Sequence, residues 1–179
     1  MKNDFVMPIV VLTLICLVVA GAIAATNSVT EPIILTAAEA RAEAARYDMI
    51  PEATGFEEES GVQGLPDSVR EIYRAKNNAE EIGFIFMLVV GGYGGDIPVI
   101  CAIGPDGRLI SAATLSHSET RGLGTKIDTD EQFAGQFANV DRGGLEGVSA
   151  ITGATLSSNA FISAIEDAFA AFETVGGMR

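Results

Sequence analysis

The chain has 179 residues, of which 48% are hydrophobic, and this suits one folded domain plus a segment of another kind. Its formal net charge of -13 argues against a nucleic-acid partner, because neutralising phosphates requires a basic surface. Two cysteines and one histidine are too few for a four-ligand iron–sulfur or zinc site from this chain alone, so a redox function would need an organic carrier.

The first segment with a clear pattern runs from Phe5 to Ala25 and is almost continuously apolar. About 20 residues at about 1.5 Å each cover the hydrocarbon core of a bilayer, so this run predicts a membrane-spanning helix. Ala22-Ile23-Ala24 resembles a signal-peptide cleavage site, but the run is long for a signal peptide and we favour a retained anchor over residues 1–26. Lys2 precedes the run and the next basic residue is Arg41, so the positive-inside rule places the N-terminus in the cytoplasm and the following domain outside it.

A linker and a helix are expected next, over residues 27–66. Asn27 to Pro32 predicts a short link. An Ala- and Glu-rich helix follows from Thr36 to Tyr47, where Thr36 and Glu39 have the spacing of a capping box. Pro51 to Pro66 contains glycine, proline and three consecutive glutamates, which predict a loop whose acidic run is a solvated surface rather than a metal site.

The third part, residues 67–179, begins with patterns typical of strands. Val69 to Lys76 is compatible with either a helix or a strand. Asn77-Asn78 and the strongly apolar run Ile82 to Val90 follow it, and this combination favours a hairpin.

A second hairpin is predicted by Ile97 to Ile103 and Arg108 to Leu115. These strand-like runs flank Gly104-Pro105-Asp106-Gly107, a strong turn signal. Asp128 to Phe137 is expected to be a short helix, and Val140 to Glu146 a loop.

A long amphipathic helix is predicted at the C-terminus. One face is polar, with Ser163, Glu166, Asp167 and Glu173. The other face is apolar at helical spacing and is expected to enter a core; it consists of Ala160, Phe161, Ala164, Ile165, Ala168, Phe169 and Phe172.

The tetrapeptide Thr152-Gly153-Ala154-Thr155 stands at the mouth of this helix. The free backbone N–H groups of a helix N-terminus favour an anion. Gly153 and Ala154 remove the side-chain bulk that would keep a large ligand away. An ordinary helix cap is the alternative, because serine and threonine are common at that position.

Three blocks of the sequence resemble the FMN-binding domain family shared by the RnfG and NqrC subunits of membrane redox complexes. They occur in the same order as in that family. The most specific is Ser149–Ser158, which resembles the flavin attachment motif. The others are Gly92–Ile97 and His117–Gly124, and the resemblance extends over most of the chain. Two positions depart from the family pattern: Ser149 stands where an aspartate is usual, and Arg121 where a proline is usual.

The resemblance implies an FMN cofactor held covalently, through a phosphoester bond to Thr155. It also implies further cofactor contacts. The glycines on either side of Leu123 let the backbone approach the flat flavin ring, and Leu123 packs on the face of that ring. His117 is the only histidine, and without a partner motif we interpret it as incidental. Gly91 to Gly95 lacks the lysine of a phosphate-binding loop, so a tight turn or bulge is at least as good an interpretation. The cofactor residues predicted besides Thr155 are Thr152, Gly153, Ala154, Leu156, Glu119, Thr120, Leu123 and Gly124.

The predicted fold is α+β, with one N-terminal transmembrane helix followed by a single FMN-binding domain made of an antiparallel sheet and flanking helices. By resemblance, the protein is expected to relay electrons through FMN within an ion-translocating ferredoxin:NAD oxidoreductase (Rnf) complex. It would not hold the ferredoxin or NAD sites, and its partners would be the membrane, other membrane subunits and a flavin-attaching transferase. The alternatives are an NqrC-like or other membrane-bound flavin carrier, and a non-redox anchored structural subunit.

Overall fold

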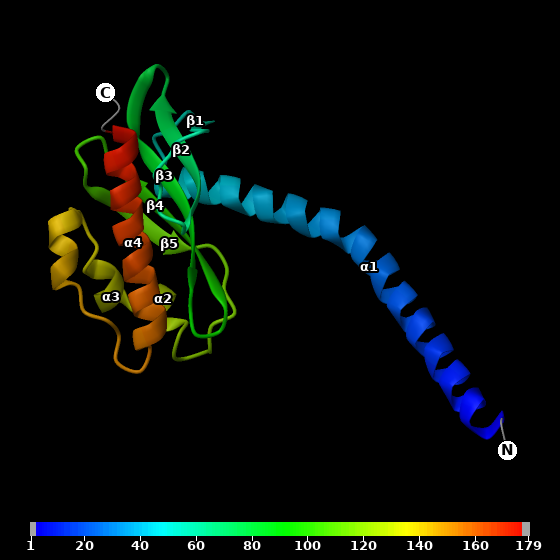
Figure 1. Ribbon diagram of the computed structural model, residues 1–179. Coiled ribbons are helices and arrows are strands. Elements are labelled where there is room, and N and C mark those ends of the chain that lie inside the picture. The colour runs from blue at the N-terminus through cyan, green and yellow to red at the C-terminus, as the bar shows by residue number, and fades with distance from the viewer. Residues whose placement is uncertain (1–2, 177–179) are drawn as a thin grey trace. The chain divides into compact units, whose positions relative to one another are not determined.

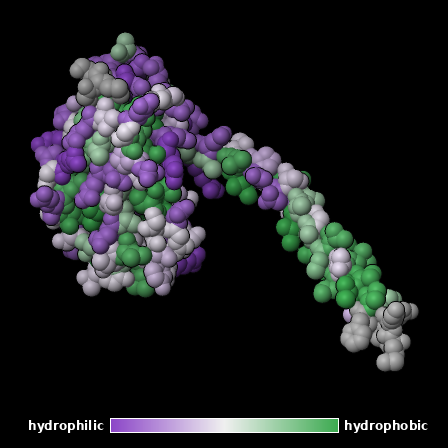
Figure 2. Space-filling model, in the orientation of Figure 1, coloured by the Kyte–Doolittle hydropathy of each residue, from purple (hydrophilic) through white to green (hydrophobic). Residues whose placement is uncertain are grey.

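The computed structural model describes residues 3–176, and the chain divides into two compact units, Met1–Ala42 and Glu43–Arg179. The described residues of the first unit belong to a single helix, α1, which runs from Asn3 to Met49 (Figure 1). Its apolar side chains from Val6 to Leu35 are exposed, and Figure 2 shows hydrophobic residues along the helix, interrupted by paler and hydrophilic ones. By length and composition, with a mean hydropathy of 2.8 over its most apolar window, the helix could cross a membrane. It is consistent with the predicted single-pass anchor.

The predicted link from Asn27 to Pro32 is wrong, because α1 continues through it. A proline inside a helix removes only one backbone hydrogen bond, at a cost of about 3 kcal/mol, and good helix formers such as alanine and leucine lie near this one. Thr36 therefore does not open a helix. Its hydroxyl instead donates a hydrogen bond to the carbonyl of Pro32 at 2.9 Å, one turn earlier in the same helix.

The second unit is built on a five-stranded antiparallel sheet whose spatial order follows the sequence. The structure assigns a strand to the segment after Pro66, which the sequence left open, and confirms both predicted hairpins. It corrects the loop predicted over Pro51 to Pro66, because four residues of that segment pair with the next strand. The strands are β1 (Gly55–Glu58), β2 (Val69–Asn77), β3 (Glu80–Gly91), β4 (Asp96–Ile103) and β5 (Leu109–Thr114).

One face of the sheet forms the main core against the C-terminal helix, α4, which runs from Thr155 to Gly176 (Figure 1). Alternate residues of β3 point to this face, including Phe86, which pairs with Ile72 on β2 and Cys101 on β4. The helix buries Ile165 and its apolar neighbours here, which confirms the predicted amphipathic pattern. Packing on the sheet thereby fixes the position of α4, and with it the start of the helix.

The last turns of α1 contact the opposite face of the sheet. The strand register places Tyr73, Ile85, Ala102 and Ser111 in one row on this face. The guanidinium of Arg46 lies 4.2 Å from the ring centre of Tyr73. The Ser111 hydroxyl also lies 2.7 Å from the sulfur of Met49. The end of α1 therefore belongs to the folded domain.

Short helices connect β5 to α4. The single helix predicted over Asp128 to Phe137 is instead two, α2 (Lys126–Thr129) and α3 (Glu131–Gly135). Asp130 separates them because its backbone is extended and its carboxylate accepts hydrogen bonds from the first N–H groups of α3. The loop predicted over Val140 to Glu146 contains a 3-10 helix, η1, from Arg142 to Gly147.

The packing of α4 on the sheet can be tested by truncating one core side chain. Ile165 is fully buried, so Ile165→Ala should lower the free energy of unfolding by about 2–5 kcal/mol, through lost apolar burial and the cavity left behind. Denaturant unfolding of the full chain in detergent measures this. Ser163→Ala, on the exposed side of the same helix, should change it by less than about 0.5 kcal/mol. Equal effects of the two substitutions would contradict this packing.

Candidate functional site

Three segments far apart in the sequence meet around one pocket of about 220 Å³. They are the turn between β3 and β4, the segment that follows β5, and the start of α4. The pocket is lined by Tyr93, Glu119, Thr120, Leu123, Gly124, Gly153, Ala154, Thr155, Leu156 and Ser157.

The structure gathers almost all of the predicted cofactor residues around this pocket. Only Thr152 is not among its lining residues; it is exposed in the turn just before α4. Two lining residues were missed, Tyr93 and Ser157. Both residues lie within blocks that the sequence had singled out, Tyr93 in the glycine-rich block and Ser157 in the flavin-like motif. Neither position has a pattern that assigns it a role.

The carboxylate of Glu119 joins the three segments. One oxygen, Oε1, accepts a hydrogen bond from the backbone N–H of Gly94 at 2.9 Å. The other, Oε2, accepts one from the hydroxyl of Ser157 at 2.7 Å. Glu119 is only 7% exposed, and its bond to Ser157 is buried while that to Gly94 is partly buried. A single side chain thus ties the β3–β4 turn and the first turn of α4 to the segment between them.

Glycines make this arrangement possible. A Cβ atom on Gly92 would lie less than 3.0 Å from Oε1 of Glu119, and one on Gly124 would lie equally close to Oε2. A Cβ on Gly94 would collide with the backbone carbonyl of Ser118. The two glycine-rich blocks are therefore explained here by close approach to a carboxylate and its backbone, which no larger residue would permit.

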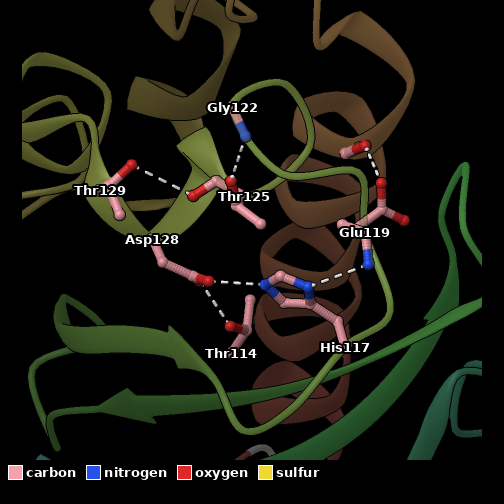
Figure 3. A network of polar contacts seen from close by, with 8 residues as sticks. Thr114, His117, Glu119, Gly122, Thr125, Asp128 and Thr129 are labelled. Carbon is pink, nitrogen blue, oxygen red and sulfur yellow. Dashed lines mark hydrogen bonds and ion pairs between the residues drawn. The ribbon is translucent and has the colours of Figure 1, made fainter.

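His117 holds the backbone that carries Glu119 (Figure 3). Its Nδ1 atom accepts a hydrogen bond from the backbone N–H of Glu119 at 3.2 Å, so the ring proton belongs on Nε2. Nε2 lies 2.6 Å from Oδ2 of Asp128, whose Oδ1 accepts from the hydroxyl of Thr114 at 2.5 Å. The interpretation of His117 as incidental is wrong, because the tertiary structure supplies the partners that no local motif showed.

The Glu119 carboxyl is ionised at neutral pH. Burial alone would raise its pKa, since a charge is costly away from water. Hydrogen bonds from the Ser157 hydroxyl and from the backbone N–H groups of Gly94 and Tyr93, with the nearby His117, outweigh burial and hold the pKa below its usual value. The wall of the pocket therefore contains a buried negative charge.

The hydroxyl groups at the start of α4 differ in their availability. Ser157 and Ser158 are buried, and their hydroxyls are bonded to Glu119 and to the carbonyl of Ala154. Thr155 is exposed at the pocket, and in the part of the chain that the structure describes its hydroxyl has no hydrogen-bond partner. Beside it, Gly153 has a φ of +84°, a backbone conformation that favours glycine. These features fit a bulky ligand that reaches the helix N-terminus and contacts Thr155.

A larger groove of about 660 Å³ lies along β5 and is bordered by α2, α3 and α4. It is lined by all the residues of β5 and by His117, but by none of the predicted cofactor residues. Its size alone does not identify a site, and the chemistry gathered around Thr155 points to the smaller pocket.

Comparison with known proteins finds relatives over most of the chain. A family model described as the FMN-binding domain matches residues 92–170, a span that includes all three blocks. The G-type subunit of the proton-translocating ferredoxin:NAD(+) oxidoreductase complex of Clostridium ljungdahlii is 29% identical over 175 residues, covering 93% of this chain and 90% of that protein. The G-type subunit of the ion-translocating oxidoreductase complex of Methanosarcina acetivorans is 31% identical over 173 residues, covering 89% and 90%. Among solved structures, NqrC of Shewanella oneidensis is 17% identical with a TM-score of 0.49, covering 74% of this chain and 73% of that one.

The buried charge of Glu119 can be tested through acid unfolding. Its pKa is lowered by folding, so its contribution to stability is fully present above the usual value of 4.5 and is lost as the pH falls through the lower folded-state pKa. Glu119→Gln should cost about 1.5–3 kcal/mol at pH 7, because the hydrogen bonds to a charged acceptor are lost. It should also flatten the pH dependence below 4.5.

Unfolding curves of the full chain between neutral and acid pH measure both effects. The matched control is Glu146→Gln, which changes an exposed glutamate and should leave the curve unchanged. If Glu119→Gln unfolds as the native chain does at every pH, the carboxylate does not hold the three segments together.

Proposed function

Because this chain belongs to the family of G-type subunits of ion-translocating oxidoreductase complexes, we propose that it is a membrane-anchored flavoprotein that relays electrons through FMN. The 31% identity to the Methanosarcina protein extends over nearly the whole of both chains. The observation that carries the proposal is the single pocket in which all three sequence blocks converge around an exposed threonine at a helix N-terminus. In this role the protein positions the cofactor and tunes its surroundings, while the flavin supplies reversible electron transfer.

The flavin is held by the residues that line the pocket. Leu123 and Leu156 are 48% and 59% exposed there, and they offer apolar surface to a flat ring. The backbone N–H groups in the first turn of α4 have no partner within the helix, so they face the phosphate end. This division of apolar and polar groups matches a cofactor that is an aromatic ring at one end and an anion at the other.

The phosphate is attached covalently to Thr155. Of the hydroxyl groups in the first turn of α4, only that of Thr155 is both exposed and free, whereas Ser157 and Ser158 are buried and engaged. The phosphoester forms when the Thr155 oxygen bonds to the phosphorus of a flavin phosphate that the transferase supplies as an activated anhydride. The anhydride P–O bond breaks, its other phosphate group leaves, and the hydroxyl proton is released. The product is a diester with a single negative charge. The availability of these hydroxyls supports the choice that the sequence motif suggests.

Electrostatics favours a covalent bond over reversible binding. A free phosphate monoester carries about -1.5 to -2 charges, by analogy with phosphorylated side chains. It would have to stay beside ionised Glu119 on a chain with a formal net charge of -13. A helix N-terminus contributes only about 0.3–1 kcal/mol, up to about 2 in partly buried geometries. An ester bond removes part of the charge and prevents dissociation.

The protein acts with other membrane subunits of an Rnf complex and is loaded by a flavin-attaching transferase. Its relatives are named as subunits of ferredoxin:NAD(+) and ion-translocating oxidoreductase complexes, which supports a place among several subunits. The domain lies outside the cytoplasm, because Lys2 precedes the apolar span and no basic residue follows it until Arg41. An exported domain cannot readily replace a lost cofactor, which is a further reason for covalent attachment.

The attachment site is tested by removing one hydroxyl. Thr155→Val keeps the β-branched shape but deletes the nucleophile, so flavin fluorescence in a denaturing gel should disappear. Thr155→Ser keeps a hydroxyl at the same place and should retain at least part of the fluorescence. The full chain is produced with its flavin-attaching enzyme, and peptide mass mapping locates the flavin. Fluorescence that survives in Thr155→Val, or a flavin mapped to Thr152, Ser157 or Ser158, would show that the assignment is wrong.

The orientation is tested with a reporter fused after Arg179. An enzyme that works only in the exported compartment should be active in this fusion, because the positive-inside rule leaves the N-terminus in the cytoplasm. A second reporter that works only in the cytoplasm serves as the control and should be inactive. Activity of the cytoplasmic reporter alone would reverse the proposed topology without affecting the attachment site.

A further inference from the structure

Exposed hydrophobic side chains gather at the pocket. Among the described residues of the second unit, five large hydrophobic side chains are exposed, and three of them line the pocket: Tyr93, Leu123 and Leu156. The other two are Tyr47 and Ile110. Clustered exposed hydrophobic groups are typical of a ligand site or an interface, whereas isolated ones need no explanation.

Tyr93 is the most exposed of the five, at 74%, and its ring is free while its backbone is held. The N–H of Gly92 donates to the carbonyl of Gly95 at 2.8 Å, which closes the turn. On the other side of Tyr93, the N–H of Gly94 donates to the buried carboxylate of Glu119. The phenol hydroxyl has no hydrogen-bond partner in the described structure, and the ring lines the pocket.

A fixed backbone that carries a free, exposed aromatic ring is unusual for a surface turn. Gly92 and Gly94 admit no side chain without collision, so the turn is packed closely against Ser118 and Glu119. A turn that merely linked β3 and β4 would not need a buried carboxylate to fix it. Here the fixed backbone leaves one large aromatic ring extended into solvent at the rim of a site whose other large exposed hydrophobic side chains are leucines.

We propose that Tyr93 is a positioning residue that stacks its ring on the isoalloxazine ring of the bound flavin. This inference rests on the proposed function. Leucine side chains contact a flat ring through dispersion alone, whereas an aromatic ring adds a preferred stacked or edge-on geometry. Tyr93 thereby covers a face of the isoalloxazine ring that Leu123 and Leu156 leave open to water. Its own hydroxyl stays in contact with solvent. The Glu119 hydrogen bonds hold the turn that aims it.

The test measures the flavin itself rather than turnover. The full chain carrying covalent FMN is purified in detergent as the native protein and as Tyr93→Leu and Tyr93→Trp. A stacked phenol or indole quenches flavin emission by transient electron transfer to the excited ring, with the electron returning to the phenol or indole. Tyr93→Leu should therefore raise the fluorescence yield and lifetime several-fold, and should increase quenching by added iodide. Tyr93→Trp should keep the emission low.

Tyr47→Leu is the matched control, because it removes the other exposed tyrosine of the unit, whose ring packs on Phe56 and does not line the pocket. It should leave emission and iodide quenching as in the native protein. Attached flavin is quantified for every variant after denaturation. Loss of flavin from Tyr93→Leu with retention in Tyr93→Trp would also support the ring contact.

Attached flavin with unchanged emission and iodide quenching in Tyr93→Leu would overturn the role of Tyr93 and leave the proposed function intact. Weaker association with other subunits, with no change at the flavin, would make Tyr93 a subunit contact and overturn the inference equally. A native chain that carries no flavin after production with the attaching enzyme would overturn both.

Discussion

The site depends on the buried carboxylate of Glu119. A charge removed from water is tolerated only when hydrogen bonds replace its hydration, and Gly94 and Ser157 supply them. The same hydrogen bonds tie the β3–β4 turn to the first turn of α4. They therefore both stabilise the buried charge and shape the pocket. Close approach in turn requires glycine at Gly92 and Gly124, where any side chain would displace the carboxylate. Gly92 and Gly124, one in each glycine-rich block, are thus explained by the same acidic residue.

Support for this carboxylate comes from two directions. On one side, His117 fixes the Glu119 backbone and is itself oriented by Asp128, through a ring proton that only Nε2 can donate (Figure 3). On the other side, the hydrophobic core holds α4 against β3 and β4, which sets where Ser157 and Thr155 lie. The hydroxyl of Thr155 is therefore positioned by apolar packing further along its own helix. A flavin attached there would be held by a rigid element rather than by a loop.

The charge of the domain shapes how a cofactor can be kept. An acidic chain with an ionised group in the pocket wall offers little reversible affinity for a phosphate, and a helix N-terminus compensates only in part. The proposed covalent attachment to Thr155 would overcome this difficulty without a basic residue among those that line the pocket. The negative charge that remains beside the flavin then becomes a means of tuning it, because nearby negative charge disfavours the electron-rich form.

Much of this protein was predictable from local patterns. The apolar run of the anchor, the two hairpins and the periodicity of α4 each lie within a short stretch of chain, so periodicity and turn chemistry were enough to identify them. The cofactor motifs are equally local, but they were identified by their resemblance to a known family. Some errors arose where distant contacts decided the outcome, and others where a local effect was misjudged. The acidic segment at Glu57 became a strand only by pairing with β2, and α1 passed through Pro32 because neighbouring residues sustain the helix. The partners of Glu119 lie 25 and 38 residues away, at Gly94 and Ser157. Only the folded chain brings these residues together. It alone shows the hydrogen bonds of His117 and the exposed ring of Tyr93 at the pocket.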